Sequence, residues 1–319
     1  MKVSVVIPTY KRNQLLKRCL ESVAKQKFSS DEYEIIVADD AADAATKNLV
    51  SDFALNYIFL KFKYVALTSS HGPAAARNAG WRQAQADIVA FIDDDCIAEP
   101  GWLSAGLEAF TSTVAAVSGK LKVPIPEKPK DYELCIAWME NCRFLTANCF
   151  YRKSVLSEIG GFDEKFKAAW REDSDLYFTV LTRNLPVRFA KKAIVVHPVR
   201  KMRWGRSLKE EKKNVYNALL FKKHPLLFRK FIEPSPPWLY YLIVSCAIAG
   251  SIGTFFSSFY KAFIFLWVVL SLLFAAKRIR PASKSLSHIL ELIFTSFLIP
   301  FLSVFWRIAG AFRFGAVYF

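Results

Sequence analysis

Three consecutive aspartates, Asp93, Asp94 and Asp95, directly follow the apolar run at residues 88–92. A short apolar run without polar alternation is typical of a strand buried on both faces of a parallel sheet. Open α/β sheets bind ligands at the carboxyl ends of their strands, so we expect the three carboxylates at a ligand-binding edge. Adjacent like charges repel unless they are neutralised, and carboxylate oxygens suit Mg²⁺ or Mn²⁺ held together with substrate phosphates. The alternative is a solvated acidic turn that caps the next helix.

Strand and helix patterns alternate before these aspartates. Apolar runs at residues 3–7 and 34–38 predict two buried strands, and residues 57–67 predict a third, more irregular one. Helical patterns separate the strands, at residues 13–27, at residues 43–54 and from Gly72 onward. The alternation predicts an α/β fold with a mostly parallel sheet and right-handed crossovers. No GxGxxG follows any of these strands, which argues against a dinucleotide-binding Rossmann domain.

Polar residues stand where the predicted strands end. They are Pro8, Thr9 and Tyr10 after the first strand, Asp39 and Asp40 after the second, and Asp93 to Asp95 after the fourth. All these ends lie on one edge of a parallel sheet. An aromatic ring, carboxylates and a cation at that edge could stack a base, accept hydrogen bonds from the base and ribose, and bind a diphosphate. The sequence therefore predicts a nucleotide site.

A second carboxylate pair follows in the next part of the chain. Glu172 and Asp173 precede a helical pattern that includes Leu176 and Val180. Acidic residues there often cap or stabilise the helix N-terminus, and this is the alternative to a catalytic role. His197 ends an apolar run at residues 193–196 and could face a metal or a phosphate, although a lone histidine is more often structural.

Four segments in the first hundred residues resemble the motifs of family 2 glycosyltransferases of GT-A fold. They are VSVVIPTY at residues 3–10, EIIVADD at 34–40, GPAAARN at 72–78 and FIDDD at 91–95, in the family's order. The resemblance covers about residues 1–200. It implies an inverting enzyme that uses a nucleotide sugar, with UDP expected, together with Mn²⁺ or Mg²⁺.

The resemblance also implies roles for individual residues. Tyr10 and Asp40 would contact the base, Arg77 the nucleotide region, and Asp93 or Asp94 the ribose and donor sugar. Asp95 of the DXD-type motif would bind the metal, and Asp173 would be the general base beside Glu172. Asp93 and, from its position alone, His197 are further candidate metal ligands. Ala41 and Ala42 stand where the family commonly has Gly-Ser, so the assignment of Asp39 against Asp40 stays open.

The acceptor side is less defined by the sequence. Residues 200–204, RKMRW, are similar to the QxxRW signature of processive synthases, with Arg200 in place of Gln. Arg203 could bind diphosphate and Trp204 could stack on an acceptor sugar, and we expect addition of a single sugar. Trp138, in a stretch with few other signals, is a further candidate acceptor contact.

The hydrophobic fraction of 53% is high for a soluble enzyme, and the excess lies from Trp238 onward. We expect a catalytic domain at residues 1–204, a basic amphipathic interface helix with a Pro-rich linker at 205–237, and a membrane region at 238–319. Within this region, residues 238–276 predict a helical hairpin, and residues 286–306 an interfacial or third membrane helix. The basic stretch could instead be a solvated helix that packs on the domain.

Charge and cysteine content bear on location. The net charge of +16 clusters beside the apolar segments, which favours contact with membrane lipids over nucleic acid. Six cysteines form no CxxC pair and no secretory signal is evident, so we expect a cell-membrane protein whose catalytic domain faces the cytoplasm.

Three functions remain open at this point. The leading one is transfer of a sugar to a hydroxyl of a lipid-linked or polysaccharide acceptor. A polyprenyl-phosphate glycosyltransferase would need no general base, so Glu172 and Asp173 argue against it. A catalytically silent membrane scaffold with a nucleotide fold is opposed by the candidate metal and base carboxylates.

Overall fold

The computed structural model describes residues 1–318, and these form two compact units. The first unit comprises Met1–Pro124 and Ala137–Val199. The second comprises Ile125–Ile136 and the chain from Arg200 onward. The short excursion at Ile125–Ile136 is a feature that the sequence patterns did not predict.

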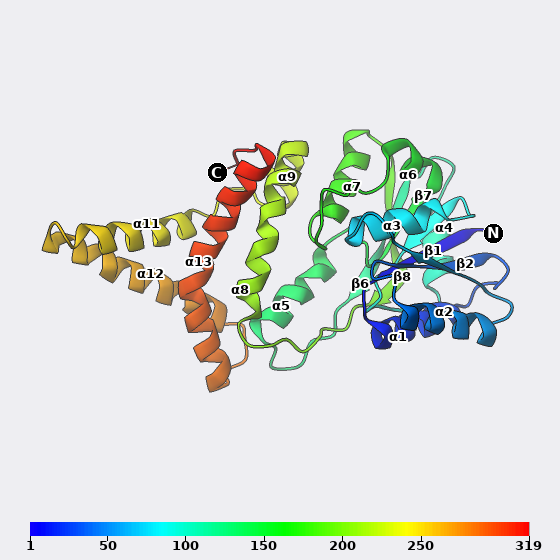
Figure 1. Ribbon diagram of the computed structural model, residues 1–319, viewed down its shortest axis with the longest axis horizontal. Helices are drawn as coiled ribbons and strands as arrows, with labels where there is room; N and C mark the ends of the chain where they lie inside the picture. The colour runs from blue at the N-terminus through cyan, green and yellow to red at the C-terminus, as the bar shows by residue number, and fades with distance from the viewer. Residues whose placement is uncertain (319) are drawn as a thin grey trace. The chain divides into compact units, whose positions relative to one another are not determined.

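An eight-stranded sheet forms the centre of the first unit (Figure 1). Its order is β3-β2-β1-β4-β7-β6-β8-β5. The first four strands pair in parallel, β7 runs antiparallel to both its neighbours, and β5 is antiparallel to β8. The predicted α/β class is thus confirmed, with a mixed sheet. The strands are β1 (Val3–Thr9), β2 (Tyr33–Asp39), β3 (Lys61–Ala66), β4 (Ile88–Phe91), β5 (Ile97–Ala98), β6 (Ala116–Lys122), β7 (Cys149–Arg152) and β8 (Val187–Val196).

Two apolar cores cover the two faces of this sheet. Successive strand residues point to opposite faces, so Val5 joins one core and Val6 the other. The Val5 core includes side chains from α1 (Asn13–Ala24), α2 (Ala44–Asn56) and α4 (Trp102–Glu108), and the Val6 core includes side chains from α3 (Pro73–Arg82), α6 (Lys153–Ile159) and α7 (Glu172–Thr182). Figure 1 shows α1 and α2 on one side of the sheet and α3 on the other.

Helix α3 lies very close to β1 because it carries a glycine at the contact. A Cβ on Gly80 would lie 2.4 Å from Cγ1 of Val6, which is closer than real side chains approach. The close approach of α3 to the sheet fixes where Arg77, on the same helix, enters the carboxyl edge of the strands.

The second unit is helical and contains most of α5 (Asp131–Ala137). Its other helices are α8 (Arg206–Glu210), α9 (Val215–Lys223), α10 (Pro225–Phe231), α11 (Trp238–Gly253), α12 (Lys261–Ile279) and α13 (Leu286–Phe314). The basic stretch expected as one amphipathic helix is divided, because Pro225 cannot continue α9 and instead begins α10.

The apolar segments differ in length. Helix α12 with the turn before it, Ser258–Ile279, and α13 are long and apolar enough to cross a membrane by length and composition. Helix α11 has 16 residues, which is about 24 Å and short of a typical hydrocarbon core. Helices α11 and α12 form a hairpin, and α13 runs across its base (Figure 1).

Helix α13 continues through Pro300 to Phe314 and buries several polar side chains. His288, Thr295, Ser303 and Arg307 are among its buried residues. Apart from Ser287 and Arg313, its exposed residues are large and apolar, namely Leu286, Leu290, Phe294, Leu298, Phe305, Ile308 and Phe312. Such an apolar outer face differs from that of a helix on a water-soluble protein, whose outer face is polar.

Candidate active site

The ends of β1, β2 and β4 meet at one edge of the sheet, as their parallel pairing requires. Thr9 pairs with Asp39 in register across β1 and β2, and Val6 of β1 pairs with Phe91 of β4. The Thr9 hydroxyl donates a hydrogen bond of 2.8 Å to Asp94 Oδ2. Polar residues far apart in the sequence are therefore neighbours at this edge.

The three aspartates after β4 have different surroundings. Asp93, with 26% of its side chain exposed, accepts a hydrogen bond of 2.8 Å from Arg77 Nη2. Asp94 is buried and accepts from Thr9 and, at 3.2 Å, from Arg12 Nη1. Burial raises the pKa of Asp94 to about 6, although the Arg12 guanidinium opposes the shift. Asp94 is thus buried and Asp93 is paired with Arg77, so the aspartates do not form a solvated acidic turn.

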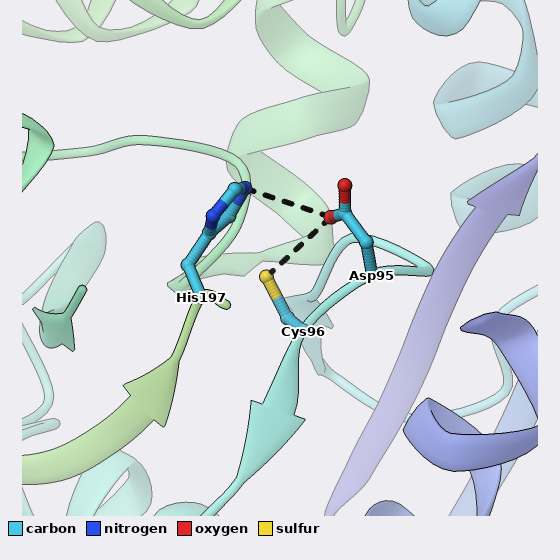
Figure 2. Close-up of side chains that lie close together, drawn as sticks. All are labelled: Asp95, Cys96 and His197. Atoms are coloured by element: carbon cyan, nitrogen blue, oxygen red, sulfur yellow. Dashed lines mark hydrogen bonds and ion pairs between the residues drawn. The ribbon is translucent and has the colours of Figure 1, made fainter. Parts of the chain in front are cut away.

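Asp95 lies beside His197 and Cys96, as Figure 2 shows. His197 Nε2 is 3.6 Å from Asp95 Oδ1, and Cys96 Sγ is 3.9 Å from the same oxygen. One ligand atom from each residue lies within 4.8 Å of the others. His197 Nδ1 is buried and has no hydrogen-bond partner among residues 1–318. A carboxylate and an imidazole are donors that suit Mn²⁺, so these residues fit a divalent cation.

Two features of this cluster differ from what the sequence predicted. Asp93 lies outside the group that could hold a metal, and its side chain instead contacts Arg77. Cys96 was not predicted as a member. The signal for it was only its position, directly after the aspartates and directly before β5.

Arg77 joins the strand edge to the helix that bears the second carboxylate pair. It is 3% exposed, and its Nη1 and Nη2 atoms contact Glu172 Oε1 at 2.9 Å and Asp93 Oδ1 at 2.8 Å. Burial alone would lower the pKa of Arg77, but the two carboxylates raise it, so the guanidinium stays charged. The sequence motif had suggested a nucleotide contact for this residue and gave no sign of the bridge.

Glu172 and Asp173 begin α7 after Arg171, which has a left-handed backbone with φ of 77°. Asp173 Oδ1 accepts hydrogen bonds from the Ser174 amide at 2.6 Å and from the Ser174 hydroxyl at 3.2 Å. Burial raises the pKa of Asp173, against these hydrogen bonds. Burial also raises the pKa of Glu172 to about 7, although Arg77 opposes it.

The residues after β2 have mainly local contacts. Asp39 is fully buried and accepts from the amides of Ala41 and Asp43 and from the Tyr64 hydroxyl. Asp40 accepts from the Gly72 amide at 3.0 Å and lies 2.8 Å from His71 Nδ1. Asp39 therefore holds the turn, while Asp40 links it to the start of α3.

The remaining candidates are aromatic or lie in the second unit. Tyr10, next to Pro8 and Thr9, is 55% exposed, and Trp138 in the 3₁₀ turn Trp138–Asn141 is 69% exposed. Trp204 belongs to the second unit and its ring lies 5.3 Å from that of Phe294. Arg203 is exposed in the same unit.

Two family models match the chain. The model for glycosyl transferase family 2 matches residues 4–162, and the model for glycosyl transferase family group 2 matches residues 88–306. Together they include every candidate residue named above.

Two similar curated proteins span much of the chain. Glycosyltransferase AglE of Haloferax volcanii is 26% identical over 221 residues, which is 66% of this chain and 70% of AglE. Validoxylamine A glucosyltransferase of Streptomyces hygroscopicus subsp. limoneus is 26% identical over 299 residues, which is 79% of this chain and 61% of that protein. This chain therefore spans about two thirds of the length of these relatives.

Solved structures share the fold. The mannosyltransferase PcManGT from Pyrobaculum calidifontis, in complex with GDP-Man and Mn²⁺, aligns with a TM-score of 0.64 at 17% identity, over 96% of this chain and 87% of that one. Residues 1–349 of TarS from S. aureus align with a TM-score of 0.50 at 20% identity, over 100% of this chain and 93% of that one.

Proposed function

This chain belongs to glycosyl transferase family 2, and we propose that it transfers a sugar from a nucleoside diphosphate, with UDP as the nucleotide, to a hydroxyl of a lipid-linked oligosaccharide or cell-surface polysaccharide. The observation that carries the proposal is the Arg77 bridge. One buried guanidinium holds Asp93 at the strand edge and Glu172 beside Asp173. Asp93, next to the proposed donor site, and Glu172, next to the proposed general base, are thereby held at a fixed distance from each other.

The donor would be bound at the strand edge. Tyr10 is exposed enough to stack on a base, and Asp40 lies at the adjacent turn. Asp93 keeps part of its surface exposed for the ribose or the sugar, while buried Asp94 positions Thr9 and Arg12. The relatives named above support a nucleotide-sugar donor, since PcManGT was solved with GDP-Man.

Asp95 and His197 would hold the divalent cation, Mn²⁺ or Mg²⁺. The orphaned buried Nδ1 atom of His197 and the proximity of its Nε2 atom to Asp95 support this assignment. When bound, such a cation neutralises the charge that develops on a diphosphate leaving group. Arg12, at 3.2 Å from Asp94 and 3.9 Å from Asp95, is a cation of the chain itself beside the same carboxylates.

Asp173 would be the general base. Ser174 orients one of its oxygens through two hydrogen bonds, and the raised pKa brings its basicity closer to that needed to accept a hydroxyl proton. Direct displacement at the anomeric carbon by the activated hydroxyl inverts its configuration. Glu172 acts as the partner of Arg77, and Trp138, Arg203 and Trp204 are proposed acceptor contacts.

The second unit would attach the enzyme to the cell membrane, with the catalytic unit in the cytoplasm. The apolar helices α12 and α13 and the exposed apolar face of α13 support attachment. Basic pairs at Lys222-Lys223 and Arg229-Lys230 precede α11, and Lys277-Arg278 lies in the last turn of α12, as expected for segments beside anionic lipid headgroups.

Turnover of a panel of nucleotide sugars by the purified full chain with Mn²⁺ tests the proposal. We expect one donor to be used, with activity lost on chelation and reduced at least about a hundredfold in Asp95→Asn and Asp173→Asn. Glu99→Gln makes the same carboxylate-to-amide change on the exposed Glu99 side chain and should keep activity. Asp173→Asn should retain donor binding.

Two results would oppose the proposal in different ways. Full transfer by Asp173→Asn, with the sugar found on a polyprenyl phosphate, would remove the general base and favour a phosphate acceptor. Failure of every nucleotide sugar to bind would remove the enzyme assignment and leave a scaffold.

A further inference from the structure

A small cavity in the second unit is lined by an unusual number of cations. Its volume is about 30 Å³, which is room for about two or three water-sized atoms. A cavity of that size suits the oxygens of one small anion and is too small for a sugar ring. Its lining includes Lys130, Asp131, Arg203, Arg206, Arg278, His288 and Glu291.

The positive charges in the lining exceed the negative ones. Four cationic side chains face two carboxylates. Asp131 is already paired with Arg278 at 2.8 Å. Among residues 1–318, no ion pair involves the side chains of Lys130 or Arg203. Arg206 pairs with Glu210 through Nη2, and its buried Nε–H has no hydrogen-bond partner. The cavity thus contains unused positive charge and an unused donor.

The walls of the cavity are held by a chain of hydrogen bonds. Arg278 Nη1 donates to Thr295 at 2.8 Å and to Ser296 at 3.0 Å, so α12 is tied to α13. The Asp131 amide donates to His288 Nε2 at 3.1 Å, which leaves Nδ1 of this histidine to donate to Glu291 at 3.1 Å.

The same chain continues into the segment before α8, since the other Glu291 oxygen accepts from the Gly205 amide at 2.7 Å. Three separate parts of the unit therefore contribute to one preformed wall. These are the start of α5, the segment that carries Arg203, and the adjoining ends of α12 and α13.

The cavity lies at the polar ends of the two apolar helices. Arg278 is the second-last residue of α12, and His288 and Glu291 lie in the first two turns of α13. If these helices enter a bilayer, their polar ends lie at the depth of the headgroups, where a lipid carries its phosphate.

We propose that this cavity binds the oxygens of one phosphate group of the acceptor's lipid anchor. The proposal rests on the proposed function, because it assumes a lipid-linked acceptor. The phosphate is held as an anchor and takes no part in the reaction. Lys130 and Arg203 supply charge to it, and Arg206 supplies the free Nε–H.

Binding to the purified full chain in nanodiscs tests this, with three probes. They are a polyprenyl phosphate, the neutral polyprenol of the same length, and inorganic pyrophosphate. Lys130→Gln and Arg206→Gln should each weaken binding of the phosphate-bearing probe about tenfold, the usual loss for one charge-assisted hydrogen bond. Lys128→Gln removes the same charge two residues away, at an exposed site outside the cavity, and should change nothing.

The probes separate the two sources of phosphate. Tighter binding of the polyprenyl phosphate than of pyrophosphate or polyprenol assigns the cavity to a lipid anchor. Pyrophosphate binding at least as tight, and equally sensitive to Lys130→Gln, assigns the site to a free diphosphate and overturns the lipid anchor. Equal affinities in Lys130→Gln and Lys128→Gln overturn the site altogether.

Binding of UDP with Mn²⁺, measured on the same samples, keeps this inference separate from the proposed function. Retained nucleotide binding without any anion effect rejects the cavity proposal alone. If the wild-type protein binds no UDP with Mn²⁺, the proposed glycosyltransferase function is rejected, and the cavity proposal that rests on it is rejected with it.

Discussion

Glu172 shows how a single buried carboxyl can make stability depend on pH. It is 3% exposed, and burial raises its pKa from an ordinary 4.5 to about 7 against the pull of Arg77. The folded state holds this proton to a higher pH than the unfolded state does. The contribution of the protonated Glu172 to the free energy of unfolding is therefore fully present below about pH 4.5. It is lost as the pH rises through about 7.

The glutamine side chain in Glu172→Gln cannot ionise, so this variant should not lose stability as the pH rises through about 7. We expect the free energy of unfolding of the variant, relative to wild type, to rise by about 3 kcal/mol between pH 4 and pH 8. Urea titration of the metal-free protein across that range measures it. Glu158→Gln, on an exposed side chain of α6, should give a pH-independent difference. A difference for Glu172→Gln that shrinks with rising pH would show that the Arg77 ion pair outweighs burial.

The sequence identified residue types better than residue contacts. Asp93 to Asp95 and Glu172 with Asp173 were predicted from their positions after an apolar run and before a helix. The Arg77 bridge was not, because Arg77 and Glu172 are 95 positions apart and only the packing of α3 on the sheet brings them together. Cys96 was missed since a lone cysteine after a strand has no pattern of its own.

At the scale of elements, the polarity of α13 leads to a prediction about membrane binding. Several of its polar residues are buried in the second unit, while Phe305 and Phe312 are 58% and 85% exposed. Burying one phenylalanine is worth about 1.5–3 kcal/mol, or a factor of ten or more in a partition coefficient. Phe305→Glu and Phe312→Glu should therefore each weaken co-sedimentation with liposomes at least about tenfold.

Phe59→Glu provides the matched control for that measurement. Phe59 is 79% exposed, but it lies in the turn between α2 and β3 in the first unit. Its substitution should leave co-sedimentation unchanged. If all three variants sediment like wild type, the apolar face of α13 does not contact lipid.

Element boundaries were predictable where periodicity alone decides them. The strands predicted at residues 3–7 and 34–38 appear as β1 and β2, each slightly longer than predicted. They were predictable because an apolar run that is buried on both faces must be an inner strand of such a sheet. Pro300 lies inside the last predicted helix, residues 286–306, and α13 passes through it. A proline removes one backbone hydrogen bond, and contacts along the helix can outweigh that loss.

At the scale of the whole molecule, the two proposed ligands belong to different units. The nucleotide edge lies in the first unit, and the basic cavity lies in the second. Sequence analysis gave the segment at residues 125–136 no separate role, and in the structure it belongs to the second unit. No local pattern signals this, because the assignment depends on long-range bonds such as that from Arg278 to Asp131.

Hydrogen exchange should therefore give two separate footprints. UDP with Mn²⁺ is expected to slow exchange at residues 8–12, 39–43 and 93–97, which carry the strand-edge contacts. A polyprenyl phosphate is expected to slow exchange at residues 130–133, 203–207 and 286–292, which surround the cavity. With Lys130→Gln the second footprint should fade while the first persists, because the nucleotide contacts do not use Lys130.

A polyprenyl phosphate that instead protected residues 93–97 and 172–174 would place its phosphate at the reacting centre, and the acceptor would then be the phosphate itself.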